Sequence, residues 1–462
     1  MSTLLTEKTI SNLTHFLIGA TLSVVVLIFL YFQVWYGPNN TPYYGDENFY
    51  VKNAENFYRH SSLEAAFSYT GRGARLLGVD AHGPAYPLLQ GGISKLIGWH
   101  LLTIPLIHLF LLGSALLCLY IRVKSELSTK LLQILLVLGC PVTLFYSMTF
   151  MPELIHISGG MMLYVLLKAY LDNKSMRNYG ILLAFILVLG FFRSTWFFAY
   201  LGLIVLPVPK KEIQAGLVLL AGLVLAFGMQ YLFHEQVPNA FSEAGNWIAQ
   251  GQWERAIADL LFNTKRNLYF LLNYTEGWFY TFQKIWLILS LIVAFFYLKK
   301  EPLIRFGVAG LLILLVFNLV FYKNYDWVDL RMYTPWVIFL NLGLIHCINY
   351  KALPLLALNF SSFLLILPFL SQLMSYRTQP GARDIPQAVE RELVDLKAPV
   401  LVHLDPAILD GYALWQLPLS NHEGEPIRYI LPYYEIEMAS PDIWLVEKDG
   451  QLSACPKKSL CQ

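Results

Sequence analysis

The sequence predicts an all-α polytopic membrane protein that carries a small soluble α/β appendage at its C-terminal end. Two observations support this fold class: the 462 residues are 56% hydrophobic but only 14% charged, and long apolar stretches recur along the chain. A soluble domain carries about 25% charged residues, so lipid must be the main solvent of this chain. The 33 basic and 31 acidic residues nearly balance, which gives no reason to expect nucleic-acid binding.

A helix that crosses a bilayer needs about 20 mostly apolar residues, or fewer where neighbouring helices thin the bilayer. By this measure we expect about eleven membrane-spanning helices. They are residues 14–35, 101–121, 131–150, 154–171, 179–192, 196–208, 214–233, 281–298, 303–322, 332–349 and 352–371. The first is too long for a signal peptide and lacks a small-residue cleavage site, so we expect it to be retained.

Basic residues in the short connections between these segments set the expected orientation. They are Arg122, Lys124 and Lys130, then Lys168, Lys174 and Arg177, then Lys210 and Lys211, then Lys299, Lys300 and Arg305, and finally Lys351. All fall on one side if residues 179–208 form two short helices, and the positive-inside rule makes that side cytoplasmic. The N-terminus is then cytoplasmic and the C-terminus periplasmic, as expected for a protein of a bacterial inner membrane.

The outer side is expected to hold the remaining bulk of the chain. Residues 1–371 form a transmembrane domain with two long outer loops, and residues 372–462 form a small periplasmic domain of short strand-like runs and Pro and Gly turns. The outer loops are residues 36–100 and 234–280, and the strand-like runs are Val400–Leu404, Arg428–Leu431 and Ile443–Val446. Oxidising chemistry on this side would permit a disulfide between Cys455 and Cys461, which the sequence leaves open.

The first outer loop opens with an acidic pair, Asp46 and Glu47, about ten residues after the first span. Aromatic and apolar residues then recur at helical spacing from Phe49 to Tyr58, which predicts an amphipathic juxtamembrane helix in the membrane interface. The pair is therefore expected at the membrane surface, in the first turn of that helix. Carboxylates are also favoured in a first turn for structural reasons alone, and this alternative stays open.

Other ionisable residues gather at the outer side. They are Arg72, Arg75 and His82 in the first loop, Glu153, Arg193 and Arg331 at the ends of spans, and Lys265 and Arg266 in the second loop. An arginine at the end of a span can simply extend to the lipid headgroups. Ionisable groups near the bilayer are costly, however, and their collection on the side of the acidic pair favours a functional role. For Lys265 and Arg266, a solvated loop face remains the alternative.

Four short motifs, in this order, resemble the GT-C superfamily of integral-membrane glycosyltransferases, which use polyprenyl-phosphate sugars. The likeness is to the protein O-mannosyltransferases and the aminoarabinose transferase of lipid A. The motifs are Gly45-Asp46-Glu47 with Tyr50 and Ala54, His82-Gly83-Pro84 with Tyr86-Pro87-Leu88, Pro152-Glu153 before an apolar run ending Leu167-Lys168-Ala169-Tyr170-Leu171, and Asp329-Leu330-Arg331 with Tyr333 and Pro335. Gly83 replaces a proline of the family pattern, and the likeness covers roughly residues 10–350.

The resemblance implies a GT-C-like fold and transfer of a single sugar to an acceptor hydroxyl with inversion. It implies Asp46 as the catalytic base, with Glu47 as a second choice or as a residue that positions the acceptor. Because guanidinium groups bind phosphate oxygens in pairs, Arg331 is the first candidate for the donor phosphate. The further phosphate candidates are Arg193, Lys265 and Arg266, and the expected substrate contacts are His82, Glu153, Tyr50, Tyr333, Arg72 and Arg75.

The expected partners are a polyprenyl-phosphate-linked sugar, a glycan, lipid or protein acceptor, and membrane lipid, with no nucleic acid. We expect no cofactor, although Asp46, Glu47 and Glu153 could offer oxygen ligands to a divalent metal. Two alternatives stay open. A transporter or flippase of lipid-linked sugars would need charges at mid-membrane and paired broken helices. An O-antigen-ligase type enzyme would need a large late outer loop, whereas the segment 323–331 is short.

Overall fold

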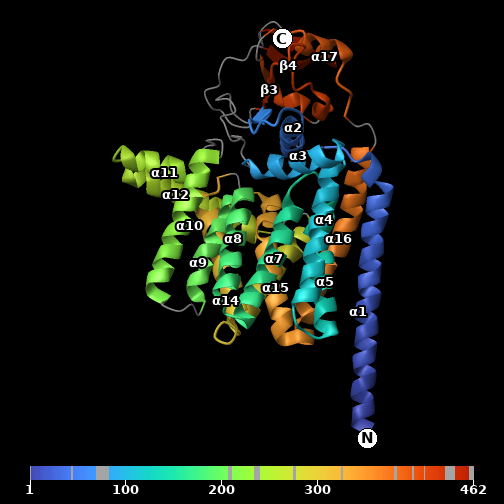
Figure 1. The fold of residues 1–462 in the computed structure, drawn as a ribbon, viewed down its shortest axis with the longest axis vertical. Coiled ribbons are helices and arrows are strands. Elements are labelled where there is room, and N and C mark those ends of the chain that lie inside the picture. Colours follow the sequence, from blue (N-terminus) through green and yellow to red (C-terminus); the bar gives the residue numbers. More distant parts are fainter. Residues whose placement is uncertain are drawn as a thin grey trace.

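The structure is a computed structural model that describes residues 2–42, 45–68, 83–206, 211–233, 240–273, 277–323, 326–378, 382–397, 400–409, 411–431 and 443–456. It shows a bundle of apolar helices with a small mixed β-sheet at one end (Figure 1). Three residues singled out in the sequence, Arg72, Arg75 and His82, lie outside the described residues.

Apolar helices make up the bundle, and each membrane segment expected from the sequence falls on one or more of them. They are α1 (Ser2–Trp35), α4 (Thr103–Arg122), α5 (Leu127–Leu138), α6 (Pro141–Ser147), α7 (Glu153–Asp172), α8 (Met176–Phe192), α9 (Phe198–Gly202), α10 (Lys211–Phe233), α13 (Trp278–Phe295), α14 (Pro302–Phe321), α15 (Thr334–Ile348) and α16 (Leu353–Thr378). Long helices satisfy every backbone hydrogen bond internally, which is what a hydrocarbon surrounding requires.

Fewer stretches are long and apolar enough to cross a membrane than the eleven expected. In the described part of the chain there are seven, or eight if α5 and α6, which meet at 57°, form one broken span. The break falls at Pro141, whose ring cannot continue the preceding helix. One of the seven, Thr334–Thr378, contains both α15 and α16, joined by η5 (Asn349–Ala352). The stretches Met176–Phe192 and Ser194–Val205 are apolar but shorter.

The centre of the bundle is the contact of α7 with α15. Fourteen of the 20 residues of α7 and twelve of the 15 of α15 are buried, so both helices are surrounded by protein rather than lipid. A glycine allows their close approach: a Cβ at Gly160 would lie 2.8 Å from the carbonyl oxygen of Pro335. Glu153 begins α7, and Arg331 lies in the turn just before α15. The close packing of the two helices therefore fixes the position of one side chain relative to the other.

Basic connections lie at the end of the bundle opposite the sheet. Lys168 and Asp172 at the end of α7 interact electrostatically with His346 at the end of α15, as does Glu301 just before α14. The N-terminus of α1 lies at this same end, and the C-terminal sheet lies at the other (Figure 1). This separation is what the positive-inside rule requires if the basic end is cytoplasmic.

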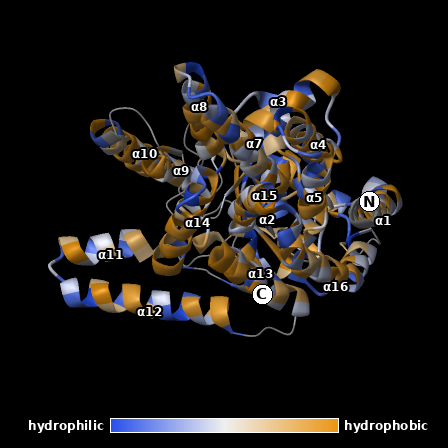
Figure 2. Cartoon of the chain, turned by 90° about the horizontal axis from the view of Figure 1, so that it is seen from below, coloured by the Kyte–Doolittle hydropathy of each residue, from blue (hydrophilic) through white to orange (hydrophobic). Residues whose placement is uncertain are grey.

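Four further helices lie at the sheet end, namely α2 (Gly45–His60), α3 (Ala85–Ile97), α11 (Ala240–Ala249) and α12 (Trp253–Leu272). Helices α11 and α12 run across the bundle axis and extend to one side of it (Figures 1 and 2). Large apolar side chains of α12, including Leu261 and Phe262, are exposed, whereas Asn263 and Asn267 are buried and donate hydrogen bonds to carbonyl groups at the end of α14. Such amphipathic helices suit the membrane interface.

The C-terminal sheet has five strands in the order β1-β3-β2-β4-β5. The strands are β1 (Phe67–Ser68), β2 (Val400–Leu404), β3 (Ile427–Ile430), β4 (Ile443–Lys448) and β5 (Gln451–Cys455). The three strand-like runs predicted in the tail are confirmed as β2, β3 and β4. All neighbours pair in parallel except β4 and β5, and α17 (Gln387–Val394) packs beside them.

The sheet includes a strand from the first loop, and its last strand ends at a disulfide-bonded cysteine. Strand β1 comes from the first outer loop, so the sheet joins two parts of the chain that lie far apart in the sequence. Cys455 is disulfide-bonded, and Cys461, the partner considered from the sequence, lies outside the described residues.

The two ends of the bundle predict opposite accessibility to a membrane-impermeant thiol reagent. In a background in which the exposed Cys347 is changed to Ser, His422→Cys at the sheet end should be labelled in sealed cells. Lys174→Cys at the basic end is exposed too, and it should be labelled only after the membrane is permeabilised. Labelling of Lys174→Cys in sealed cells would contradict the orientation.

Candidate functional site

The candidate site is a cluster of ionised side chains at the sheet end of the bundle. Glu153 begins α7, Arg193 directly follows α8, and Arg331 lies in η4 (Trp327–Met332), just before α15. Pro152 and Glu153 suit a helix start, because proline loses no hydrogen bond there and a carboxylate interacts with the free N–H groups. Three turns that are distant in the sequence thus meet at one place.

Two guanidinium groups share the carboxylate of Glu153. Its Oε1 accepts a hydrogen bond from Nη2 of Arg193 at 3.3 Å and lies 3.6 Å from Nε of Arg331. The side chain is only 3% exposed, and among the described residues its Oε2 has no hydrogen-bond partner. Arg331 also donates through Nη1 to the hydroxyl of Tyr146 at 3.2 Å. Two guanidinium groups therefore lie at one carboxylate, and guanidinium groups are also the side chains that bind phosphate oxygens in pairs.

Asp46 approaches this cluster from the first outer loop. It lies in the first turn of α2, is half-buried, and interacts electrostatically with Arg331 and Tyr50. Tyr50, one turn further along α2, also interacts with Glu153 and Arg193. Asp46, predicted as the base, and Arg193 and Arg331, predicted to bind phosphate, are therefore close enough to belong to one cluster of interacting charges.

Burial shifts the titration of two groups in this neighbourhood. The pKa of Asp329 is raised to about 6 by desolvation, although Arg331, at 3.9 Å, and the N–H of Asp326 favour the ionised form. The pKa of Tyr50 is raised well above its ordinary value, first by burial and then by the nearby Tyr86, Glu153 and Asp46. Tyr50 is therefore a neutral hydroxyl at physiological pH, and Asp329 changes charge near pH 6.

Glu47, the second acid of the pair, has a different environment. Its Oε1 accepts hydrogen bonds from Nη2 of Arg377 at 3.0 Å and from the backbone N–H of Phe150 at 2.9 Å, and both charged side chains are fully buried. Arg377, in the last turn of α16, also donates to Oδ1 of Asn40 and to the carbonyl of Thr41, each at 2.9 Å. These contacts suit a residue that holds the sheet end of the bundle together.

Sequence reasoning missed Arg377. It lies six residues after the end of the last expected span, 352–371, and so falls in the segment expected to form the C-terminal domain. The available signal was its position: like Arg193 and Arg331, Arg377 is an arginine at the outer end of a span. Its partner, Glu47, could not be read from the sequence because the pair joins the first outer loop to the last helix.

The other predicted residues have varied positions. Tyr333 is fully buried immediately before α15, next to η4. Lys265 is exposed on α12, and Arg266 donates hydrogen bonds to the carbonyl of Lys323 and to Oδ1 of Asn267. The contacts of Arg266 attach α12 to the chain that follows α14, which supports a structural role for it.

A second group that sequence reasoning missed lies one turn below Glu153. His156 of α7 accepts a hydrogen bond at Nδ1 from the indole N–H of Trp196 at 3.1 Å, and its Nε2 lies 2.8 Å from the hydroxyl of Tyr86. Tyr86 belongs to the second family-like motif and packs edge-to-face on Tyr50, with ring centroids 5.1 Å apart. The first two family-like motifs thus meet beside the ion cluster.

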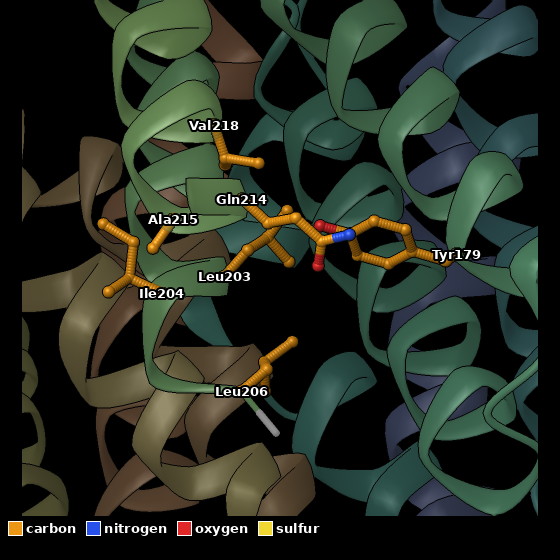
Figure 3. A pocket seen from close by; sticks show the side chains of 7 residues that line it. All are labelled: Tyr179, Leu203, Ile204, Leu206, Gln214, Ala215 and Val218. Carbon is orange, nitrogen blue, oxygen red and sulfur yellow. The ribbon is translucent and has the colours of Figure 1, made fainter. Parts of the chain in front are cut away.

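Two hollows lie away from this site. One is a cavity of about 10 Å³ at the basic end, where Tyr179 of α8 faces Gln214 of α10 (Figure 3). That volume is about one water molecule's probe sphere, too small for a substrate. The other is an apolar groove of about 490 Å³ between α1 and α16, beside Pro368. Within the described ranges, no group of three or more His, Cys, Asp or Glu side chains could hold a metal ion.

Breaking the buried pair of Glu47 and Arg377 is expected to destabilise the fold strongly. Either Glu47→Ala or Arg377→Ala leaves one buried charge without its partner, which costs about 3–5 kcal/mol. The double variant Glu47→Gln/Arg377→Met should lose less than the sum of the single losses. Thermal unfolding in detergent measures this, and Asp172→Asn, which removes the exposed pair with Lys168, is the control, with a cost of about 0–1 kcal/mol. Equal effects of the buried and exposed variants would contradict this assignment.

Comparison with models of known protein families gives no match to this chain, and comparison with curated proteins gives none either.

Proposed function

We propose that this chain is a GT-C-type glycosyltransferase, which moves a single sugar from a polyprenyl-phosphate donor to an acceptor hydroxyl at the outer face of the inner membrane. The observation that carries the proposal is the meeting of Asp46 with the cluster of Arg193, Glu153 and Arg331 at the sheet end of the bundle. The site combines a carboxylate and two guanidinium groups at the boundary of an apolar bundle. A lipid-linked phosphate can arrive from the bilayer, and a polar acceptor can arrive from water.

Transfer of a sugar from a phosphate requires a base for the acceptor hydroxyl and positive charge near the departing phosphate. As the acceptor oxygen forms a bond to the anomeric carbon, its proton passes to the carboxylate of Asp46, which acts as the general base. The bond between that carbon and the phosphate oxygen breaks, and its electron pair leaves with the phosphate. Arg331 and Arg193 stabilise the negative charge that develops there. A single displacement of this kind inverts the configuration at the anomeric carbon.

Glu153 is proposed to hold the two arginines together. Without its carboxylate, Arg193 and Arg331 would repel each other in a poorly solvated place, and neither would keep its position. The Oε2 atom, which has no hydrogen-bond partner among the described residues, is then available to a hydroxyl of the sugar or of the acceptor. Glu47 acts indirectly, because its pairing with Arg377 fixes the start of α2 and therefore the neighbouring Asp46.

The architecture proposed with this function is the GT-C-like one, in which all eleven predicted segments reside in the membrane. The segments that fall short of a full span, Met176–Phe192 and Ser194–Val205, lie next to buried helices of the bundle, so neighbouring protein can cover their ends. The sheet lies above the site, at the end we propose to be periplasmic (Figure 1). The acceptor is then a glycan, lipid or protein that reaches the site beside this sheet.

Removal of the base or of the phosphate arginine should abolish transfer without unfolding the protein. Asp46→Asn is expected to lower the rate by about 10²–10⁴-fold, the usual contribution of a general base. Arg331→Gln should lower it by about 10²–10³-fold, because a donor to the developing charge is lost. The assay is sugar transfer in membranes from a panel of synthetic polyprenyl-phosphate hexoses and pentoses.

Matched control variants for this assay lie far from the site. Asp172→Asn at the basic end and Arg383→Gln, whose side chain pairs with Glu447 in the appendage, should transfer at nearly the rate of the unmodified chain. Near-normal transfer by Asp46→Asn would show that Asp46 is not the base. Cell-surface glycans compared by mass spectrometry with and without the chain would identify the sugar and the acceptor.

Asp329 predicts a pH dependence of anion binding. Its pKa is about 6, so below that pH the protonated side chain no longer competes with an external anion for Arg331, and above it the carboxylate does compete for that guanidinium. Sulfate keeps a constant charge in this range. Its affinity should therefore fall as the pH rises from 5 to 7, that is, across the Asp329 pKa of about 6. Titration calorimetry of Asp329→Asn should show a flatter profile, and an unchanged profile would contradict the assignment.

A further inference from the structure

Tyr146 brings a hydroxyl group to the ion cluster, and the proposed displacement makes no use of it. This hydroxyl lies 3.2 Å from Nη1 of Arg331. Tyr146 is buried, at 5% exposure, whereas the side chain of Arg331 is 21% exposed and can be reached from outside the bundle. An anion held by Arg331 would therefore be adjacent to the hydroxyl of Tyr146.

The donor and acceptor capacities of the two side chains fix the direction of their hydrogen bond. A guanidinium group can only donate, so the oxygen of Tyr146 accepts from Arg331 and keeps its own proton. Within the described part of the chain, the hydroxyl bonds to Arg331 alone, so its proton has no acceptor there. Because a buried donor without an acceptor is unfavourable, this proton is well suited to a bound ligand.

Two further buried atoms of the cluster have unused hydrogen-bonding capacity. In the ranges that the structure describes, Oε2 of Glu153 and Nε of Arg331 have no hydrogen-bond partner. The nearest approach of that Nε to the carboxylate is 3.6 Å, to Oε1 of Glu153, which is longer than a hydrogen bond. Together with the hydroxyl of Tyr146, the cluster thus offers two donors and one acceptor. A phosphate that is linked to a sugar can supply the matching acceptors and a donor.

The fold holds Tyr146 in place at the cluster. Helix α6 meets α5 at 57°, because Pro141 interrupts the preceding helix. The carbonyl groups at the other end of α6 accept hydrogen bonds from the side chains of Gln33 at 3.1 Å and Asn40 at 2.8 Å. Both ends of this short helix are therefore constrained, and the hydroxyl is positioned beside Arg331 before any ligand binds.

We infer that Tyr146 is a further ligand-binding residue, whose hydroxyl donates a hydrogen bond to a phosphate oxygen of the lipid donor at Arg331. The identity of the ligand rests on the proposed function, but the contact itself requires only that an isoprenyl phosphate binds here. Because its oxygen accepts from a cation, the hydroxyl is polarised and becomes a stronger donor. It is also neutral, so it helps to hold the anion without adding to the repulsion between Arg331 and Arg193.

Binding of geranyl phosphate to the full chain in nanodiscs of a zwitterionic lipid tests the inference without any transfer reaction. Tyr146→Phe removes only the hydroxyl and should weaken binding about tenfold, as expected for one hydrogen bond to a charged group. The affinity for geraniol, which has the same chain without the phosphate, should not change. The matched control is Tyr164→Phe, because Tyr164 is also buried and its hydroxyl accepts from Gln133 at 3.3 Å. This control should bind geranyl phosphate as the unmodified chain does.

A fluorinated tyrosine at position 146 separates donation to the ligand from simple support of Arg331. Fluorine makes a phenol more acidic, so the hydroxyl becomes a stronger donor and its oxygen becomes a weaker acceptor. With 3-fluorotyrosine in place of Tyr146, at a pH that keeps the phenol neutral, geranyl phosphate should therefore bind more tightly than to the unmodified chain. A hydroxyl that served only to hold Arg331 would give weaker binding. The ¹⁹F signal should shift with geranyl phosphate and not with geraniol.

The outcomes distinguish this inference from the proposed function. Unchanged affinity of Tyr146→Phe, an equal loss of geraniol binding, weaker binding by the fluorinated chain, or no binding of geranyl phosphate at all would each overturn the inference. If Tyr146→Phe does not fold, the fluorinated chain, which keeps the ring and the hydroxyl, still decides the matter. If binding depends on Tyr146 but no sugar is transferred, the inference stands and the transferase assignment is wrong. If sugar is transferred but binding does not depend on Tyr146, only the inference fails.

Discussion

The buried ion pair of Glu47 and Arg377 is the interaction on which the sheet end of the molecule depends. It joins the start of α2 to the end of α16, and the same two side chains reach the chain after α1 and the backbone before α7. Two unsolvated charges are tolerated there because hydrogen bonds from several elements surround them. The position of Asp46, the next residue along α2, follows from this pair, and so does its proximity to Arg331.

The scarcity of charge and the concentration of charge at one end have one physical cause. A bundle that faces lipid cannot expose ionised groups along its length, so those groups must lie at the ends of the helices. At the basic end they are solvated. At the sheet end, Glu153, Arg193 and Arg331 are largely withdrawn from water, where their mutual interactions are stronger and a bound phosphate would be held more tightly.

The sequence pattern was enough to identify some residues of the candidate site but not others. Asp46, Glu153, Arg193 and Arg331 could be selected because each is an ionisable residue at the outer end of an apolar segment. The different environment of Glu47 could not, since Asp46 and Glu47 are adjacent acids with the same local pattern. His156 could not be selected either, because its partners, Tyr86 and Trp196, lie on other elements and the histidine looks like an ordinary helix residue in the sequence.

The sequence by itself determined the membrane class, the placement of the apolar segments, the strands of the tail and the side on which the polar residues gather. These properties depend on composition and local periodicity, which each segment carries alone. Only the tertiary structure decided the pairing of Glu47 with Arg377, the sharing of Glu153 by two arginines, and the addition of β1 from the first loop to the C-terminal sheet. Such contacts join residues that are remote in the chain, and their geometry exists only once the helices have packed.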